Sequence, residues 1–532
     1  MKGLSLKRLN LYSERTIWFY LVMVLLIAVS FSIKLFYIDS QSYWLDESYT
    51  RWFIGQTYRD LVFWVPTFES HPPLYYILAK SWGIVFGGIA ENSERYFSLL
   101  LSAFLFIPLY LALRKPHESV RSSALISMTV LICFSDILSW YSIEARPYLL
   151  LTLSFSLSIL GMLRLINQKK SPVYWVVFTL GCVLTNWSHN LGCILSLGLL
   201  ITLAFHFIFV EKKIKSLGLL AISALMIFIF SVPLLFMIMQ QLKGWSDHSW
   251  IPEVNEVRVF NALRELFAFS FYSEKLPYRW SISDLLLRIT SSLPSAIVLT
   301  YFSWMSVKSL DHERIYLTFN TVFIIAVAMI VTYAGPNVFL DRTLTPVLIP
   351  LYLFIAINIS KLNSPTAKFI ITFYLLISLS YSTIYQFNTK EKEPWNYIIS
   401  LINENRNSET KVFLFPNYLE LAILKNDLDR ELTSTAIPLP FKYPAMNRSN
   451  FYPGGTPSVP GFTADNIEAL IEEIGTSTTR ILLLVRSESL YDPELLIRKN
   501  IKRSGWSESI LYTNGGITLY DYKNRLKRVL VE

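Results

Sequence analysis

Charged residues are scarce in this chain of 532 residues, because Asp, Glu, Lys and Arg together make up only 16% of it. An average soluble domain carries about a quarter. Apolar residues make up 53% of the chain and the mean hydropathy is +0.40. Several apolar runs reach the ~20 residues that a helix needs to cross ~30 Å of hydrocarbon. The composition therefore excludes an ordinary soluble enzyme and predicts a polytopic membrane protein.

Cysteine is also rare. The three cysteines, Cys133, Cys182 and Cys193, all lie within apolar runs and form no CxxC motif. This pattern excludes a disulfide framework and a cysteine-rich metal site, and it is typical of small buried hydrophobic residues. The net charge of +9 does not indicate a nucleic-acid partner, because the basic residues sit between apolar runs rather than in one patch. The positive-inside rule produces that distribution.

Eleven apolar segments are expected to span the membrane. The first, Ile17 to Ile38, is too long for a signal-peptide core, and no small-residue cleavage site follows it, so we expect an uncleaved span. The predicted spans are 17–38, 96–113, 122–140, 147–166, 172–188, 190–210, 217–239, 285–306, 315–334, 342–360 and 367–386.

The loops between these spans alternate in basic content. The basic clusters comprise Lys2, Lys7, Arg8 and Arg15; Arg114, Lys115 and Arg121; Arg164, Lys169 and Lys170; Lys212, Lys213 and Lys215; Lys308 and Arg314; and Lys361 and Lys368. If all of them face the cytoplasm, the N-terminus is inside and the tail is outside. Counting Pro73 to Gly87 as a span would move every later cluster outside. We therefore expect an amphipathic surface helix or a re-entrant helix there.

The tail changes character at about Asn388. Strand-like apolar runs alternate there with helical patterns: Val412–Phe415 and Ile481–Val485 for strands, Pro394–Asn405 and Asp465–Gly475 for helices. Asn447 to Gly461 is rich in Pro, Gly and Ser and is predicted to be a loop. About 145 residues are enough to bury a core.

The predicted fold is an all-α polytopic membrane bundle of about 11 transmembrane helices, with surface helices in the first outer loop. A small C-terminal α/β domain outside the cytoplasm completes it. The predicted domains are residues 1–386 for the transmembrane bundle and 387–532 for the outer α/β domain.

The loops predicted to face outward hold an unusual set of ionisable residues: Asp46, Glu47, Glu69, His71, Glu144, Arg146, His189, Asp341 and Arg342. Such groups are costly beside a bilayer unless they pair, hydrate or titrate. A carboxylate there can deprotonate an acceptor, and an arginine can hold a phosphate bidentately. Together they favour transfer of a group that is carried on a lipid phosphate.

Each of these residues also has an ordinary structural interpretation. The Asp46–Glu47 pair can belong to a solvated loop, and HPPLYY can simply begin a helix, since proline is well tolerated there. Glu144 and Arg146 can form an ion pair that closes a short turn. His189 beside a tryptophan is typical of a membrane interface, and Asp341 with Arg342 can anchor a span end. No single residue decides between the two interpretations.

Taken in order, five segments resemble the GT-C superfamily of membrane glycosyltransferases, and most closely its protein O-mannosyltransferase and aminoarabinose transferase group. The segments are Asp46–Glu47 after the first span, HPPLYY (71–76) with SERYFSLL (93–100), WYSIEARPY (140–148), FLDRTLTPVLIP (339–350) and KEPWNYI (392–398). The resemblance is strong over about the first 150 residues. The middle spans match only in hydropathy.

The resemblance implies a donor sugar on a polyprenyl phosphate and an active site at the outer face. It assigns Asp46 as the general base, with Glu47 as support or second acid, and Glu144 as the acidic residue of the second outer loop. A divalent metal is used by some relatives, with Asp46 and Glu144 as its candidate ligands here. No cofactor is required by the sequence.

The same resemblance implies a set of substrate-binding residues: His71, Tyr75, Arg95, Arg146, Tyr148 and Arg342. Arg146 and Arg342 would meet the lipid phosphate, although Thr343 stands where relatives often have Tyr. The aminoarabinose branch carries Lys where this chain has His71. This departure favours the wider bacterial group of hexose transferases, acting on an envelope glycolipid, glycan or protein in the plasma membrane, with no nucleic acid involved.

Two other classes remain open at this stage. A lipid-linked-glycan flippase or transporter would place paired charges mid-bilayer, often in broken helices or repeats. No repeat is evident in the sequence. An O-antigen-type polymerase or ligase usually depends on a large central outer loop, whereas the 240–284 loop is modest and the tail is large.

Overall fold

The computed structural model describes residues 2–69, 71–86, 92–114, 122–167, 171–245, 254–272, 274–335, 337–427, 432, 434–437 and 478–524. By their contacts the residues divide into two compact units. The bundle unit comprises Met1–Asp39 and Thr57–Lys390, and the tail unit comprises Ser40–Gln56 and Glu391–Glu532. The predicted helices Asp465–Gly475 and the predicted loop Asn447–Gly461 lie outside the described residues.

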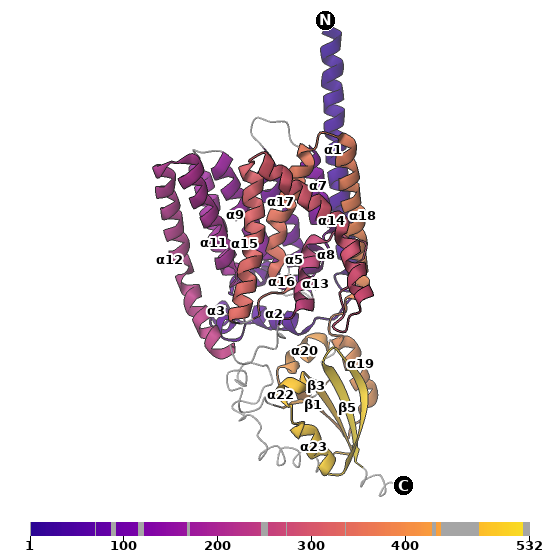
Figure 1. Cartoon of the computed structure of the whole chain (residues 1–532). Helices are drawn as coiled ribbons and strands as arrows, with labels where there is room; N and C mark the ends of the chain where they lie inside the picture. The colour runs from indigo at the N-terminus through magenta and orange to yellow at the C-terminus, as the bar shows by residue number, and fades with distance from the viewer. Residues whose placement is uncertain are drawn as a thin grey trace. The chain divides into compact units, whose positions relative to one another are not determined.

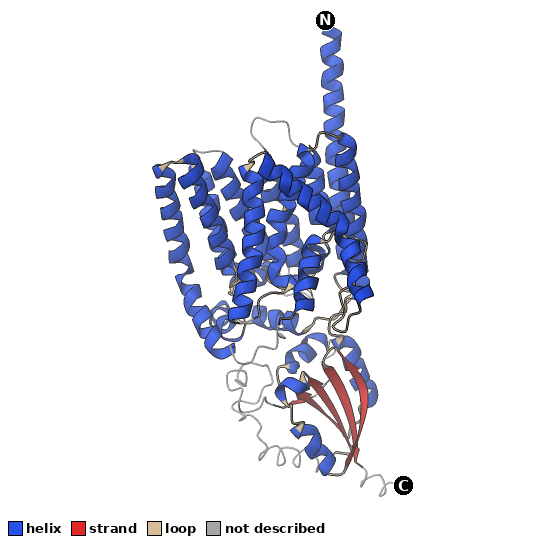
Figure 2. Cartoon of the chain, in the orientation of Figure 1, coloured by secondary structure: helices blue, strands red, loops and turns tan. Residues whose placement is uncertain are grey.

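The bundle unit is helical (Figures 1 and 2). Its elements are α1 (Lys2–Tyr37), α3 (Tyr58–Phe68), α4 (Leu74–Val85), α5 (Ser93–Phe104), α6 (Phe106–Leu113), α7 (Ser122–Phe134), α8 (Asp136–Ser142), α9 (Tyr148–Asn167), α10 (Pro172–Ser188), α11 (Gly192–Phe205), η1 (His206–Glu211), α12 (Ile214–Trp245), α13 (Glu256–Phe267), α14 (Ile282–Lys308), α15 (His312–Ala334), α16 (Asp341–Leu344), η2 (Thr345–Val347), α17 (Leu348–Lys361) and α18 (Pro365–Thr389).

Every predicted span coincides with a helix or a helix pair. Among the described residues, nine helical stretches are long and apolar enough to cross a membrane: Ile17–Tyr37, Ser93–Leu113, Tyr148–Asn167, Gly192–Glu211, Ile214–Met239, Ile282–Lys308, His312–Ala334, Asp341–Lys361 and Pro365–Thr389. A tenth is the pair α7 and α8, which is bent by 56° at Ser135. The eleventh predicted span is α10, whose 17 residues are at the lower limit for crossing.

The prediction that residues 73–87 do not cross the membrane agrees with the structure. Helix α4 has 12 residues and is therefore about 18 Å long, well short of the hydrocarbon thickness. The chain is a multi-pass membrane protein with an all-α bundle, as its composition predicted.

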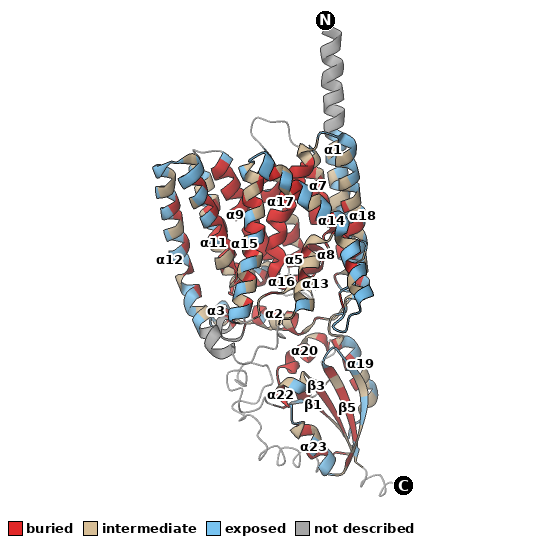
Figure 3. Cartoon of the chain, viewed as in Figure 1, coloured by how far each residue is buried: buried red, intermediate tan, exposed pale blue. Residues whose placement is uncertain are grey.

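Burial separates inner from outer helices (Figure 3). In the apolar stretches of α9 and α17, 89% and 94% of residues are buried inside the protein, against 28% for α12 and 17% for α14. Close approach of α9 to α10 depends on glycine, since a Cβ at Gly181 would lie 2.6 Å from the Ser158 backbone nitrogen. Small residues of this kind let membrane helices pack with their backbones in contact.

The tail unit contains a five-stranded sheet of order β2-β1-β3-β5-β4. Its elements are α2 (Leu45–Gly55), α19 (Trp395–Asn405), β1 (Thr410–Phe415), α20 (Leu419–Asn426), β2 (Thr435–Ala436), β3 (Arg480–Arg486), α22 (Glu488–Tyr491), α23 (Leu496–Arg503), β4 (Trp506–Asn514) and β5 (Ile517–Asn524). Strands β1, β2 and β3 are parallel, whereas β5 runs antiparallel to both β3 and β4. Val412–Phe415 and Ile481–Val485, predicted as strands, lie in β1 and β3.

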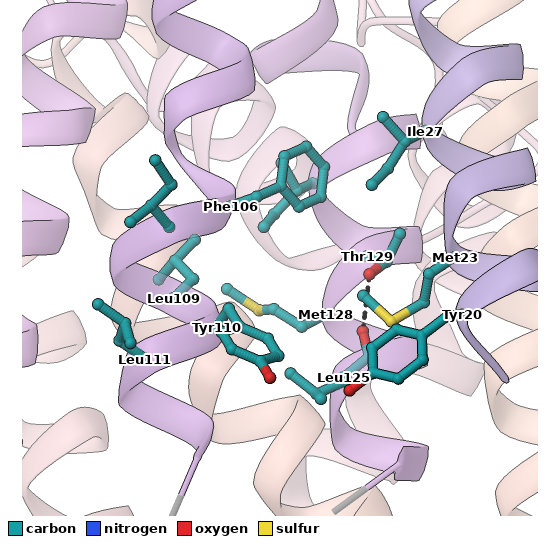
Figure 4. Close-up of a pocket in the computed structure, with 12 residues that line it drawn as sticks. Tyr20, Met23, Ile27, Phe106, Leu109, Tyr110, Leu111, Leu125, Met128 and Thr129 are labelled. Atoms are coloured by element: carbon teal, nitrogen blue, oxygen red, sulfur yellow. Dashed lines mark hydrogen bonds between the residues drawn. The ribbon is translucent and has the colours of Figure 1, made fainter. Parts of the chain in front are cut away.

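A cavity of about 360 Å³ lies in the bundle between α1, α6 and α7 (Figure 4). Its lining is almost wholly apolar and includes Met23, Leu109 and Met128, with Tyr20 and Tyr110 at its side. None of the predicted site residues lines it. Its chemistry is that of a space for hydrocarbon, so it does not hold the polar site.

Candidate functional site

A buried polar cluster joins three of the turns that the sequence analysis singled out. It is formed by Glu69, His71, Arg146, Tyr148 and His189, and is called the turn cluster below. Glu69 follows α3, and His71 precedes α4. Arg146 lies in the turn before α9, Tyr148 is the first residue of α9, and His189 follows α10. All five side chains are at least nine-tenths buried. Residues up to 120 positions apart in sequence therefore meet in the bundle unit.

Arg146 is held bidentately within this cluster. Its Nη1 donates to Glu69 Oε2 at 2.9 Å, and its Nη2 donates to Glu69 Oε1 at 3.1 Å. Nη1 also lies 3.3 Å from the hydroxyl of Tyr76 in α4, and burial raises the pKa of that hydroxyl. The fork of an arginine matches a carboxylate in this way and fixes the plane of the guanidinium. The predicted phosphate-binding arginine is thus present, buried and oriented by a carboxylate.

Three aromatic rings pack beside this ion pair. The His71 and His189 ring centroids are 4.5 Å apart, and the Tyr148 ring lies 5.9 Å from His71 and 6.2 Å from His189. His71 Nε2 is 3.9 Å from Glu69 Oε1. The HPP segment and the WYSIEARPY turn, which are separate in the sequence, therefore form one site.

The protonation state of His189 follows from its hydrogen bonds. Its Nδ1 accepts a hydrogen bond from the Leu191 backbone N–H at 3.1 Å, so the proton of the neutral ring is on Nε2. Among the described residues, that buried Nε2–H has no hydrogen-bond partner. Burial, and then the positive charges of Arg146 and Arg342, lower the pKa of His189 to about 3. The ring is consequently neutral, with its one N–H donor on Nε2.

A second group of charges surrounds the start of α16. Asp341 Oδ2 lies 3.7 Å from Lys390 Nζ and 3.9 Å from Lys275 Nζ, and Lys275 also pairs with Glu265 at 2.8 Å. Burial lowers the pKa of Lys275, but the Glu265 and Asp341 charges outweigh it and raise the pKa overall. Next to Asp341, Arg342 is close enough to His189 to influence its ionisation. The arginine of the FLDR segment therefore lies near the turn cluster.

Among the other predicted site residues of the bundle unit, Glu144 is buried, and Tyr75 and Arg95 have structural partners. Glu144 is 2% exposed, two residues before Arg146 in the same turn. The Tyr75 hydroxyl bonds Ser98 at 2.8 Å in α5. Arg95 donates through Nη1 to the Ile38 carbonyl at 2.8 Å, at the C-terminal end of α1, where carbonyls lack helical partners. Substrate binding by Tyr75 and Arg95 stays a prediction.

Asp46 and Glu47 lie in the tail unit, in the first turn of α2. Asp46 is half-buried, whereas Glu47 is fully buried. Glu47 Oε2 lies 2.9 Å from Lys392 Nζ, in the KEPWNYI segment. Two motifs that the sequence analysis treated separately are thus joined by an ion pair.

No family model matches the chain, and no curated protein matches its sequence. Solved structures do match its fold. ArnT from Cupriavidus metallidurans in the apo state matches with a TM-score of 0.61 at 11% identity, over 96% of this chain and 98% of that chain. ArnT bound to undecaprenyl phosphate matches with a TM-score of 0.56 at 10% identity, over 94% and 97%.

The archaeal oligosaccharyltransferase AglB from Archaeoglobus fulgidus, in complex with an inhibitory peptide and a dolichol-phosphate, also matches. Its TM-score is 0.52 at 13% identity, over 96% of this chain and 74% of that chain. The chain has the GT-C fold. At these identities the match concerns the fold, and it covers the bundle together with the tail.

Two residues of the turn cluster were not assigned a role from sequence. Glu69 was seen only as one of several outward carboxylates, and His189 was interpreted as an interfacial residue. The signal for Glu69 was its position two residues before His71. For His189 the sequence holds no comparable signal, because its role depends on the approach of α10 to α4.

A metal site was also tested. Among the residues that the structure describes, no group of three or more His, Cys, Asp or Glu side chains is arranged to hold a metal ion. Asp46 and Glu144, named as candidate ligands, lie in different units of the chain, and the use of a metal stays a prediction.

Proposed function

We propose that this protein is a glycosyltransferase that moves a sugar from a polyprenyl-phosphate donor to an envelope acceptor, at the outer face of the plasma membrane. The observation that carries the proposal is the turn cluster, in which an oriented arginine and a buried neutral N–H donor meet. Solved GT-C structures bound to undecaprenyl phosphate and dolichol-phosphate add support. The acceptor class is an envelope glycolipid, glycan or protein.

The phosphate is the leaving group of this reaction. The acceptor oxygen forms a bond to the anomeric carbon while the bond from that carbon to the phosphate oxygen breaks, with inversion. The polyprenyl phosphate leaves with one more negative charge than it had in the donor. Arg146, with its plane fixed by Glu69, and Arg342 would neutralise that charge, and His189 Nε2–H would donate to a phosphate oxygen.

The acceptor proton needs a base. Asp46 is the proposed general base, on the strength of its motif after the first span and its place at a helix N-terminus, where a negative charge is favourable. His71 would contact the acceptor or the donor phosphate. The proton goes to the Asp46 carboxylate, so the products are the glycoside and the polyprenyl phosphate.

The test uses the purified full-length protein in lipid nanodiscs with radiolabelled polyprenyl-phosphate sugars. Asp46→Asn is expected to abolish sugar transfer without changing expression or insertion. Arg146→Gln is expected to reduce transfer about a hundredfold or more, because the developing phosphate charge loses an oriented partner. The acceptor is first identified by mass spectrometry of envelope glycans and glycolipids from a deletion strain.

Arg164→Gln is the matched control for Arg146→Gln. Arg164 lies in α9, the helix that begins two residues after Arg146, about 24 Å beyond its first residue Tyr148. It bonds the backbone carbonyls of Leu111 and Arg114. That variant should keep its transfer rate per folded molecule. Near wild-type transfer by Asp46→Asn would remove Asp46 from catalysis, and labelled polymer as the product would favour a polymerase instead.

A further inference from the structure

Residues 41–47 are attached to the tail by a series of hydrogen bonds within the tail unit. The Lys392 N–H donates to Gln41 Oε1 at 2.7 Å, and the Asn396 N–H donates to Ser42 Oγ at 3.2 Å. Asn426 in α20 bonds both backbone groups of Tyr43, at 3.1 Å and 3.0 Å. A segment that follows the first span is therefore tied to residues about 350 positions later.

Two side chains extend this attachment into the first turn of α2. Lys392 Nζ lies 2.9 Å from Glu47 Oε2, and the two side chains are 6% and 0% exposed. Glu393 Oε2 accepts a hydrogen bond from the Leu45 backbone N–H at 2.9 Å. Since N–H groups in the first turn have no partner within a helix, Glu393 fills the role of a cap from elsewhere in the chain.

Glu393 is itself held by the sheet. Its Oε1 lies 2.8 Å from Arg486, the last residue of β3, and its Oε2 also accepts from Trp395 Nε1 at 3.0 Å. A continuous path of charged hydrogen bonds therefore runs from the end of β3 through Glu393 to Leu45. Asp46 lies between Leu45, whose N–H bonds Glu393, and Glu47, which pairs with Lys392.

We infer that Lys392, Glu393 and Glu47 form a clasp that positions Asp46, and that the tail domain is a working part of the transferase because it holds the helix that carries the base. The inference rests on the proposed function, since it needs Asp46 to act as the base. The three residues are positioning residues, because they act through Asp46. The clasp gives the tail a task that does not require it to touch acceptor or donor.

Breaking the clasp tests the inference. In Lys392→Met, hydrogen–deuterium exchange of the α2 amides (45–55) should become faster, because the helix start loses its anchor. The kcat for transfer should fall about a hundredfold, the cost of a misplaced catalytic group, while the KM for the lipid donor changes little. Lys392→Arg should keep both the α2 exchange rate and kcat close to the wild-type values, since it retains the cation.

The matched control breaks a different, partly buried ion pair in the same unit. Arg480 Nε and Nη2 pair with Asp521 at 2.7 Å and 2.8 Å, joining β3 and β5 without contacting α2. Asp521→Asn should lower the thermal midpoint but leave α2 exchange and kcat per folded molecule unchanged.

The outcomes separate the clasp from the proposed function. Unchanged α2 exchange in Lys392→Met overturns the clasp, and faster exchange with wild-type kcat overturns its positioning role. If Asp46→Asn is active, Asp46 is not the base of the proposed function. The clasp then positions no base, whatever the exchange data show. Faster exchange, lower kcat and rescue by Lys392→Arg, in an enzyme that Asp46→Asn inactivates, support both.

Discussion

At the scale of single residues, the Glu69–Arg146 pair shows why buried charges in this bundle come in matched sets. Both side chains are more than nine-tenths buried, so each alone would carry a large desolvation cost. Their bidentate geometry offsets part of that cost and leaves the arginine in one orientation. The two residues are 77 positions apart, and no sequence pattern links them.

Sequence reasoning reached the residue types of the site but not their pairings. His71 and Arg146 were selected because ionisable residues recur in loops of one predicted side, whereas Tyr148 was implied only by the resemblance of its segment to the GT-C superfamily. Glu47 was expected to support catalysis directly, and its buried pairing with Lys392 was not foreseen. These pairings depend on which turns lie close together. The packing of many apolar side chains between the helices decides that, and no short sequence pattern records it.

His189 yields a prediction about pH. Its pKa is lowered to about 3 in the folded protein and is about 6.5 when unfolded, so the unfolded state binds more protons between these values. The contribution of neutral His189 to the free energy of unfolding is therefore fully present above pH 6.5. It decreases as the pH falls toward 3, by up to ~1.4 kcal/mol per pH unit. His189→Gln should flatten the decline of the thermal midpoint between pH 6.5 and 4.5.

If His189→Gln shows the same slope as wild type, His189 is not buried in its neutral form.

At the scale of elements, hydropathy located the spans because a bilayer imposes length and apolarity on each helix separately. The break at Ser135 was not foreseen, since α7 and α8 read as one apolar run. The β4–β5 hairpin was also missed, although Asn514-Gly515 followed by a second glycine is a strong turn signal. Both glycines adopt positive φ there.

The α9–α10 contact leads to a prediction for Gly181. A Cβ at this position would meet Ser158 backbone atoms at 2.6 Å and 2.9 Å, so even Gly181→Ala must push the helices apart. The expected loss of stability is about 1–3 kcal/mol. Donor affinity should also fall, because α9 begins at Tyr148 and α10 leads to His189. Thermal unfolding and binding of labelled polyprenyl phosphate measure the two effects.

Gly218 in α12 is the matched control, because nothing lies within 4 Å of a Cβ added there. Gly218→Ala should be neutral or stabilising by up to about 1 kcal/mol, through its gain in helix propensity. A Gly181→Ala variant as stable as Gly218→Ala would contradict the close packing of α9 and α10.

At the scale of the whole molecule, the alternation of basic loops predicts the orientation in the membrane. We expect a periplasmic-type reporter fused after Lys390 to be active, and the same reporter fused after Lys213 to be inactive. Activity in alkaline phosphatase fusions provides the measurement. The reverse pattern would place the tail in the cytoplasm and invert the proposed side of the reaction.

The tail unit is discontinuous in sequence, because it combines Ser40–Gln56 with Glu391–Glu532. The change of composition near residue 387 predicts a single boundary there between bundle and tail. Composition carries no sign that residues 40–56 pack with the tail, since that segment is short and lies more than 330 positions before the tail begins. Discontinuous units of this kind are visible only in three dimensions.

The clasp has a consequence for biosynthesis. Glu47 and Lys392 are separated by 345 positions, so at ~5–20 residues per second the ribosome adds the second partner about 20–70 s after the first. Until then α2 lacks its hydrogen-bond partners from the tail, however completely the translocon has inserted the early spans. Under the proposed function, glycosyl transfer would therefore begin only when translation is nearly finished. A chain that ends before residue 392 would be inserted into the membrane without transferase activity.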